Sequence, residues 1–111
     1  PKELQEKISN FEQIKLQLQT VMSQRGELEA RKKEIDSSVK ALEEKKGGDT
    51  FRRIGDLLIK VDDDDKLLND LKDEAETMGV RLNSLSTQEK SMREMYENLG
   101  KEINDSLKGS G

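Results

Sequence analysis

The sequence contains no cysteine, no histidine and no tryptophan, and its 111 residues include a single proline. Without cysteine the chain cannot form disulfides, a reactive thiolate or a sulfur-ligated metal site, and an intracellular location is expected. A glycine-rich phosphate loop before a helix is also missing, and the many carboxylates fall on predicted solvent-facing helix surfaces. The sequence therefore predicts neither an enzyme nor a cofactor.

The chain also lacks a long apolar run and a basic start followed by an apolar segment, the patterns of membrane spans and signal peptides. No membrane partner is expected, and the match of Asn104-Asp105-Ser106 to a glycosylation acceptor is interpreted as fortuitous. The 20 basic and 24 acidic residues are mixed along the chain and give a net charge of −4. Because there is no basic stripe, nucleic acid is not expected as a partner either.

Apolar residues are scarce, at 31% of the chain, and aromatic residues make up only 3%, whereas charged residues reach 40%. One globular core at this length normally needs a larger apolar share. The composition fits either a disordered chain or two long helices whose core is a narrow seam. The spacing of the apolar residues decides between these two structures.

Two segments, residues 2–46 and 63–108, repeat apolar residues with the 3.5-residue period of a coiled coil. Six unbroken heptads in each segment favour a coiled coil over disorder, because a random charged sequence would not keep this period. The sequence therefore predicts a mainly α fold, a single domain over residues 1–111 built on a long antiparallel two-helix coiled coil. The core positions a and d of the first segment are Leu4, Lys7, Phe11, Ile14, Leu18, Val21, Arg25, Leu28, Lys32, Ile35, Val39 and Leu42. Those of the second segment are Leu68, Leu71, Ala75, Met78, Leu82, Leu85, Glu89, Met92, Tyr96, Leu99, Ile103 and Ser106.

The two segments match each other when the chain folds back so that the numbers of paired positions sum to 110, because each a position then meets a d position. Arg25 and Glu89, two charged core residues, fall close together in this register, and we predict an ion pair between them. In the alternative, both side chains turn outward independently. The apolar pairs of this register are Leu42 with Leu68, Val39 with Leu71, Ile35 with Ala75, Leu28 with Leu82, Ile14 with Tyr96 and Phe11 with Leu99.

Glycines and charges mark the inner ends of the two helices. Gly47 and Gly48 suit a left-handed C-terminal cap after Lys45 and Lys46, whose positive charges complement the helix dipole. The acidic run 62–65 suits the start of the second helix, where one Asp caps free N–H groups. The same run could bind a hard cation, but it lacks the ligand spacing, the glycine and the closing glutamate of a calcium loop, so capping is favoured.

Three further glycines, Gly26, Gly79 and Gly100, lie inside the helical segments but outside the core positions. Each costs about 1 kcal/mol relative to alanine in a helix. Local softness is the simplest interpretation of all three. Residues 109–111 are expected to form a flexible tail.

Between the helical segments, the apolar period changes to alternation over residues 50–61. Gly55 and Asp56 suit a two-residue turn and predict a single β-hairpin over residues 49–61, at the bend of the coiled coil, with Ile54 opposite Leu57. An isolated hairpin is marginal in water, so we interpret this one as an oligomerisation device; the alternative is a bent linker. One face carries Ile54, Leu57, Ile59 and Val61, and the other carries Phe51, Arg53, Leu58 and Lys60. The residues assigned to oligomerisation are Thr50, Phe51, Ile54, Leu57, Ile59 and Val61.

The outer ends of the helical segments carry more apolar residues than the seam requires, because Ile8 and Leu107 occupy e positions. This surface suggests a binding site at the tip, although a broadened core stripe would give the same pattern. The tip residues are Leu4, Ile8, Phe11, Leu99, Ile103 and Leu107.

The order helix, hairpin, helix, with the sequence FRRIGDLLIKV at residues 51–61, resembles the β class of the prefoldin family, and residues 80–85 with Gln88 and Glu89 are similar to archaeal members. The single hairpin indicates the β class, since α-class subunits carry two. The resemblance implies a cytoplasmic hexamer of two α and four β subunits joined by their hairpins. It also implies an ATP-independent chaperone that grips non-native polypeptides at the tips, here the six tip residues, and passes them to a group II chaperonin.

Two other functions stay open at this point. A structural coiled-coil spacer or dimerisation module without a client would show the same heptads. An RNA- or membrane-binding module is less well supported, and binding that vanished at modest salt would favour it.

Overall fold

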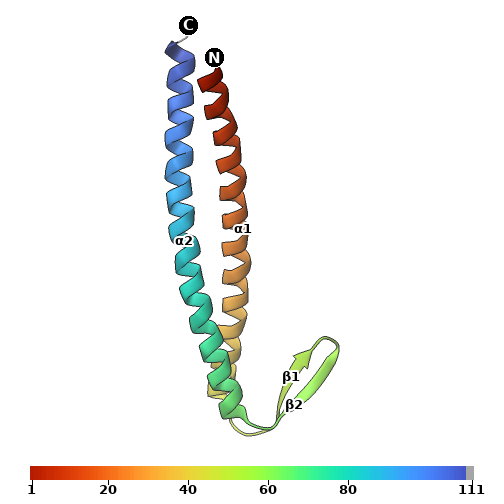
Figure 1. Ribbon diagram of the computed structural model, residues 1–111. Coiled ribbons are helices and arrows are strands. Elements are labelled where there is room, and N and C mark those ends of the chain that lie inside the picture. The colour runs from red at the N-terminus through yellow and green to blue at the C-terminus, as the bar shows by residue number, and fades with distance from the viewer. Residues whose placement is uncertain (110–111) are drawn as a thin grey trace. The chain divides into compact units, whose positions relative to one another are not determined.

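The structure is a computed structural model and describes residues 1–109. Helix α1 covers Lys2–Glu44, strands β1 and β2 cover Thr50–Ile54 and Leu57–Val61, and helix α2 covers Asp64–Gly109 (Figure 1). Two long helices with an antiparallel hairpin between them are the fold that the sequence predicts. Gly109 is the last residue of α2 rather than part of a tail, and Ser110 and Gly111 lie outside the described residues.

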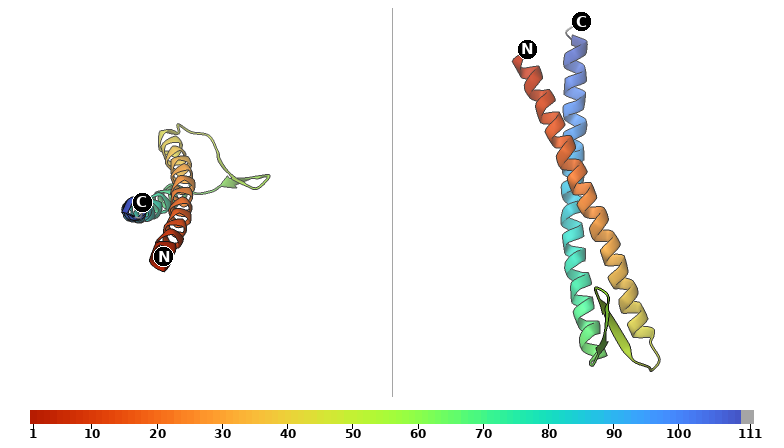
Figure 2. Two further views of the ribbon diagram at one scale, coloured as in Figure 1. Left: turned by 90° about the horizontal axis from the view of Figure 1, so that it is seen from above. Right: turned by 90° about the vertical axis from the view of Figure 1, so that its right-hand side faces the viewer.

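The chain forms two compact units, and each helix contributes to both. Unit 1 contains residues 1–27 and 82–111, and the N-terminus and the end of α2 lie at the same end of it (Figures 1 and 2). Unit 2 is the continuous segment 28–81, which holds the hairpin and the inner ends of both helices. Within residues 1–109, no helix has a stretch long and apolar enough to cross a membrane.

The burial of the helices follows the heptad pattern. In α1 all twelve predicted core positions are buried or half-buried, and every other residue of this helix is exposed. In α2 all twelve predicted positions are likewise removed from solvent at least in part. The most buried side chains are Leu18, Val21, Ile35 and Met78, at 6–9% exposure. The core is therefore the narrow seam that the composition requires.

The inner helix ends differ in how closely they follow the prediction. Helix α1 ends at Glu44, so Lys45 and Lys46 lie beyond its last turn. Gly47 and Gly48 do adopt left-handed backbone, with φ of 74° and 84°, but within the connection to β1 rather than directly at the helix end. At the start of α2, Asp63 is the cap: its Oδ1 accepts the backbone N–H of Lys66 at 3.0 Å. The capping interpretation of the acidic run is confirmed for this residue.

The hairpin has the predicted register, with Thr50 opposite Val61, Arg52 opposite Ile59 and Ile54 opposite Leu57. Gly55, the first turn residue, has a φ of 60°, whereas no residue other than glycine has positive φ in the described chain. Positive φ at the first turn position alone is the geometry of a type II′ turn, which favours glycine there.

Gly100 has a packing role that corrects its interpretation as a soft point. A Cβ built on Gly100 would lie 3.1 Å from Cε2 of Phe11, so the missing side chain lets the aromatic ring approach the helix closely. By contrast, a Cβ on Gly26 would meet nothing within 4 Å. The two glycines look alike in the sequence, but only Gly100 is required for close packing of an aromatic ring.

Candidate functional site

The hairpin presents apolar side chains to solvent on both of its faces. Ile54, Leu57 and Ile59 on one face are 58%, 63% and 46% exposed, and Phe51 and Leu58 on the other are 55% and 68% exposed. The first view of Figure 2 shows the hairpin standing to one side of the helix ends in unit 2. Nothing within residues 1–109 covers these side chains, although Thr50 and Val61 at the open end of the hairpin are half-buried.

Polar contacts within the hairpin are few. Arg53 donates from Nε to the carbonyl oxygen of Gly55 at 3.2 Å, which ties β1 to the turn. Lys60 Nζ lies 3.8 Å from Asp49 Oδ1, and both side chains are more than half exposed. Exposed pairs of this kind contribute little to stability, so the exposed apolar surface dominates the character of the hairpin.

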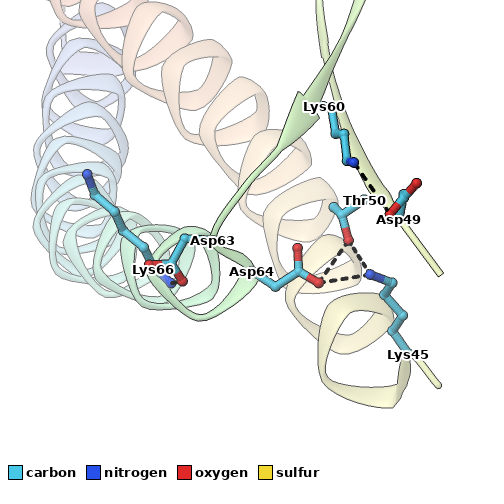
Figure 3. A network of polar contacts seen from close by, with 7 residues as sticks. All are labelled: Lys45, Asp49, Thr50, Lys60, Asp63, Asp64 and Lys66. Atoms are coloured by element: carbon cyan, nitrogen blue, oxygen red, sulfur yellow. Dashed lines mark hydrogen bonds and ion pairs between the residues drawn. The ribbon is translucent and has the colours of Figure 1, made fainter. Parts of the chain in front are cut away.

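A network of three side chains connects the hairpin to the helix ends (Figure 3). Lys45 donates from Nζ to Thr50 Oγ1 at 2.6 Å and to Asp64 Oδ2 at 2.8 Å, and the hydroxyl of Thr50 donates to the same Oδ2 at 3.1 Å. The hydrogen bonds from Lys45 and from Thr50, in that order, hold the pKa of the Asp64 carboxyl below its ordinary value of 3.8.

The sequence did not predict this network. The sequence pattern places Lys45 with the helix dipole and Asp64 in the acidic run, and no local spacing rule joins residues that lie 19 positions apart. The sequence does contain a hint of this contact. Lys45, Thr50 and the acidic start of the second helix lie on either side of a connection with two glycines, which is able to bring a cation, a hydroxyl and a carboxylate together. Within the described chain, no group of acidic residues is arranged to hold a metal ion.

The tip residues lie in unit 1, at the outer ends of both helices. Four of them belong to the seam and are half-buried, whereas Ile8 and Leu107 are 41% and 56% exposed. Within the seam, Phe11 stacks on Tyr96 with 4.5 Å between ring centroids and 14° between ring planes. The half-buried tip residues are Leu4, Phe11, Leu99 and Ile103.

Unit 1 also contains the predicted polar pair of the seam. Arg25 Nη2 lies 3.2 Å from Glu89 Oε1, and Nε of the same arginine donates to that oxygen at 3.2 Å. The side chains are 27% and 15% exposed, so they face each other in the seam and do not turn outward. The predicted ion pair is confirmed.

An open groove of about 760 Å³ lies in unit 2 between β1 and the two helices. Charged residues of both signs, among them Arg31, Arg52, Arg53, Glu34 and Glu74, line it together with apolar seam residues. The mixture of both charge signs does not select a ligand class. The exposed hairpin is the stronger candidate for a functional surface in this unit.

Comparison with known proteins supports the resemblance seen in the sequence. The family model described as prefoldin subunit matches residues 5–110. The chain belongs to the prefoldin family. Curated relatives named prefoldin subunit beta include one from Thermococcus onnurineus, 33% identical over 112 residues, covering 97% of this chain and 93% of the relative. Another, from Pyrobaculum arsenaticum, is 32% identical over 108 residues, covering 96% of this chain and 86% of the relative.

The fold matches a solved prefoldin structure as well. The crystal structure of the prefoldin beta subunit from Thermococcus strain KS-1 superposes with a TM-score of 0.82 at 29% identity, covering 96% of this chain and 94% of that one. The prefoldin β class predicted from the single hairpin is therefore confirmed by relatives and by structure, and none of these relatives is named as an enzyme.

Proposed function

We propose that this chain is a subunit of an ATP-independent chaperone that captures unfolded proteins at the coiled-coil tips and delivers them to a group II chaperonin in the cytoplasm. It assembles through its hairpin with a prefoldin α subunit and further β subunits, in a hexamer of two α and four β subunits. The observation that carries the assembly part is the hairpin itself, whose face with Ile54, Leu57 and Ile59 leaves these apolar side chains 46–63% exposed. Such a two-stranded ribbon gains stability when several hairpins join into a closed sheet or barrel.

Client capture is supported by the composition of the tip. Ile8 and Leu107 offer exposed apolar surface where the helices end, and the half-buried seam residues beside them become accessible when the ends fray. Weak apolar contacts of this kind suit clients without a common sequence. Several tips that act together raise the avidity without any new contact, because the second contact becomes intramolecular.

The experiment measures how well the assembled chaperone suppresses aggregation of reduced, unfolded lysozyme. The variant Ile8→Ser with Leu107→Ser removes the exposed tip surface and should abolish most of the suppression. The matched control is Leu16→Ser with Val80→Ser, which removes two apolar side chains that are 63% and 67% exposed away from the tip. The control should act like the unchanged protein.

Deleting residues 1–11 together with residues 99–111 tests the same point more severely. Suppression that survived both the double substitution and the deletion would contradict the proposal. It would favour the alternative of a structural coiled-coil module without a client.

A further inference from the structure

Little holds the hairpin in a fixed direction apart from the network at its base. The connection from α1 contains two consecutive glycines in left-handed conformation, Gly47 and Gly48, and the connection to α2 consists of residues 62–63. Apart from Val61, which is half-buried at the base of the hairpin, the large apolar side chains of both strands are 46–68% exposed, so packing against the helices does little to fix their direction. Within residues 1–109, the hydrogen bond from Thr50 to Asp64 is the one side-chain hydrogen bond or ion pair between a strand and a helix.

We propose that Lys45, Thr50 and Asp64 form a latch that fixes the direction in which the hairpin leaves the helices and so presents it for association with other subunits. Its three members come from the three parts that meet here (Figure 3): Lys45 directly follows α1, Thr50 begins β1 and Asp64 begins α2. The association part rests on the proposed function, whereas the fixed direction does not.

The geometry of the latch gives each residue a distinct task. Lys45 donates to both partners, at 2.6 and 2.8 Å, and so bridges the end of α1 to the strand and to α2. The Thr50 hydroxyl accepts from Lys45 and donates to Asp64, which requires a group that can do both. Serine satisfies this requirement and valine, which has nearly the shape of threonine, does not.

The latch is partly shielded from solvent on the side of Lys45. The side chain of Lys45 is 24% exposed and that of Asp64 is 39% exposed, so water screens the two charges only in part. The N-terminal end of α2 also favours the Asp64 carboxylate, because free backbone N–H groups leave positive charge there. Asp63 and Asp65 flank the carboxylate on its own element, and Lys45 is the cation that faces it.

A hairpin held in one direction loses less conformational freedom when it associates, and this raises the affinity without new contacts. Loss of a hydrogen bond in this solvent-screened latch should weaken assembly by about three- to tenfold. The residues of the latch are therefore positioning residues. Lys45 and Asp64 act through the direction of the hairpin and need not touch the partner subunit, and Thr50 has this positioning task in addition to its place among the residues assigned to oligomerisation.

The direction of the hairpin is measured in the full chain, diluted below assembly, with two spin labels. The absence of cysteine allows labels at Asp56→Cys in the turn and Lys40→Cys on α1, both exposed positions of unit 2. The unchanged latch should give a single narrow distribution of label distances. Thr50→Val and Lys45→Met should each widen it, Thr50→Ser should keep it narrow, and circular dichroism should show unchanged helicity in all of them.

Lys60→Met is the control, since it removes a lysine from the exposed 3.8 Å pair with Asp49 and leaves the latch intact. It should keep the narrow distribution. A distribution that stays narrow in both Thr50→Val and Lys45→Met would overturn the latch.

Sedimentation of the same variants with an archaeal prefoldin α subunit tests the association part. Thr50→Val should raise the dissociation constant about three- to tenfold, and Thr50→Ser should not. If Thr50→Val widened the distribution of label distances but left the dissociation constant unchanged, the latch would fix the direction of the hairpin without promoting assembly, and the association part would be wrong. Assembly that persists with the hairpin face disrupted by Ile59→Asp would instead contradict the proposed function, and the label distances would still decide the latch.

Discussion

Arg25 and Glu89 lie 3.2 Å apart in the seam between the helices of unit 1, where the heptad pattern otherwise places apolar residues. The relationship extends to Arg93, whose Nη2 lies 3.9 Å from the same Glu89 oxygen and equally far from the sulfur of Met22. Charged core residues lower the stability of a coiled coil but fix its register, since a shifted register would leave both charges without partners.

Glu89→Leu alone should lower the free energy of unfolding by about 1 to 2 kcal/mol, because it leaves the guanidinium of Arg25 in the seam without this partner. The double variant Arg25→Leu with Glu89→Leu should recover most of that loss, since two apolar side chains complete the seam. Urea unfolding of both single variants and the double variant gives the coupling energy. A coupling energy of zero would mean that the contact is incidental.

The heptads predict the seam because two helices wound around each other present the same face to the partner every 3.5 residues, so every core position from Leu4 to Ser106 could be assigned by spacing alone. The register of the hairpin could be predicted for a similar reason, since alternation and a Gly-Asp turn admit one pairing. Lys45, Thr50 and Asp64 could not be predicted to meet, because their contact depends on how the glycine connection turns. The approach of Phe11 to Gly100 is likewise a property of helix packing that no spacing rule gives.

Two glycines in unit 1 should respond differently to alanine. Gly26→Ala should raise the free energy of unfolding by about 1 kcal/mol, because alanine favours the helix and the new Cβ meets nothing within 4 Å. Gly100→Ala should gain less or lose stability, since its Cβ would lie 3.1 Å from the Phe11 ring. Thermal and urea unfolding compare the two variants.

Phe11→Leu provides the check on this mechanism. In that background the ring contact is gone, so Gly100→Ala should be as favourable as Gly26→Ala. If Gly26→Ala and Gly100→Ala changed the free energy of unfolding equally in the protein with Phe11, the close approach of the ring would not affect stability.

Asp64 should titrate below the ordinary 3.8 of an aspartate, because hydrogen bonds from Lys45 and Thr50 favour its charged form. A lowered pKa in the folded chain means that this stabilisation is fully present above about 3.8 and is lost as the pH falls through the folded pKa. Carboxyl NMR titration should show a higher Asp64 pKa in Lys45→Met than in the unchanged chain. Identical titration curves would contradict the network as the cause.

The two faces of the hairpin should differ in their importance for assembly. Ile59 belongs to the face with Ile54 and Leu57, whereas Leu58 belongs to the opposite face, where Arg53 pairs with it and Lys60 lies two residues further along the same strand. Aspartate at position 59 would place a carboxylate among Ile54, Leu57 and Val61 in a buried interface, which is costly even with Arg52 directly opposite, whereas aspartate at position 58 would join a face that carries both Arg53 and Lys60. Neither substitution lies in a helix, so helicity should stay unchanged in both.

The most direct test is the mass of the assembly in solution, measured by sedimentation equilibrium with an archaeal prefoldin α subunit. The unchanged chain and Leu58→Asp should both give the mass of a complex of two α and four β subunits, whereas Ile59→Asp should sediment as separate subunits with full helicity. An unchanged mass for Ile59→Asp, or a mass that never exceeds one chain for the unchanged protein, would contradict assembly through the hairpin.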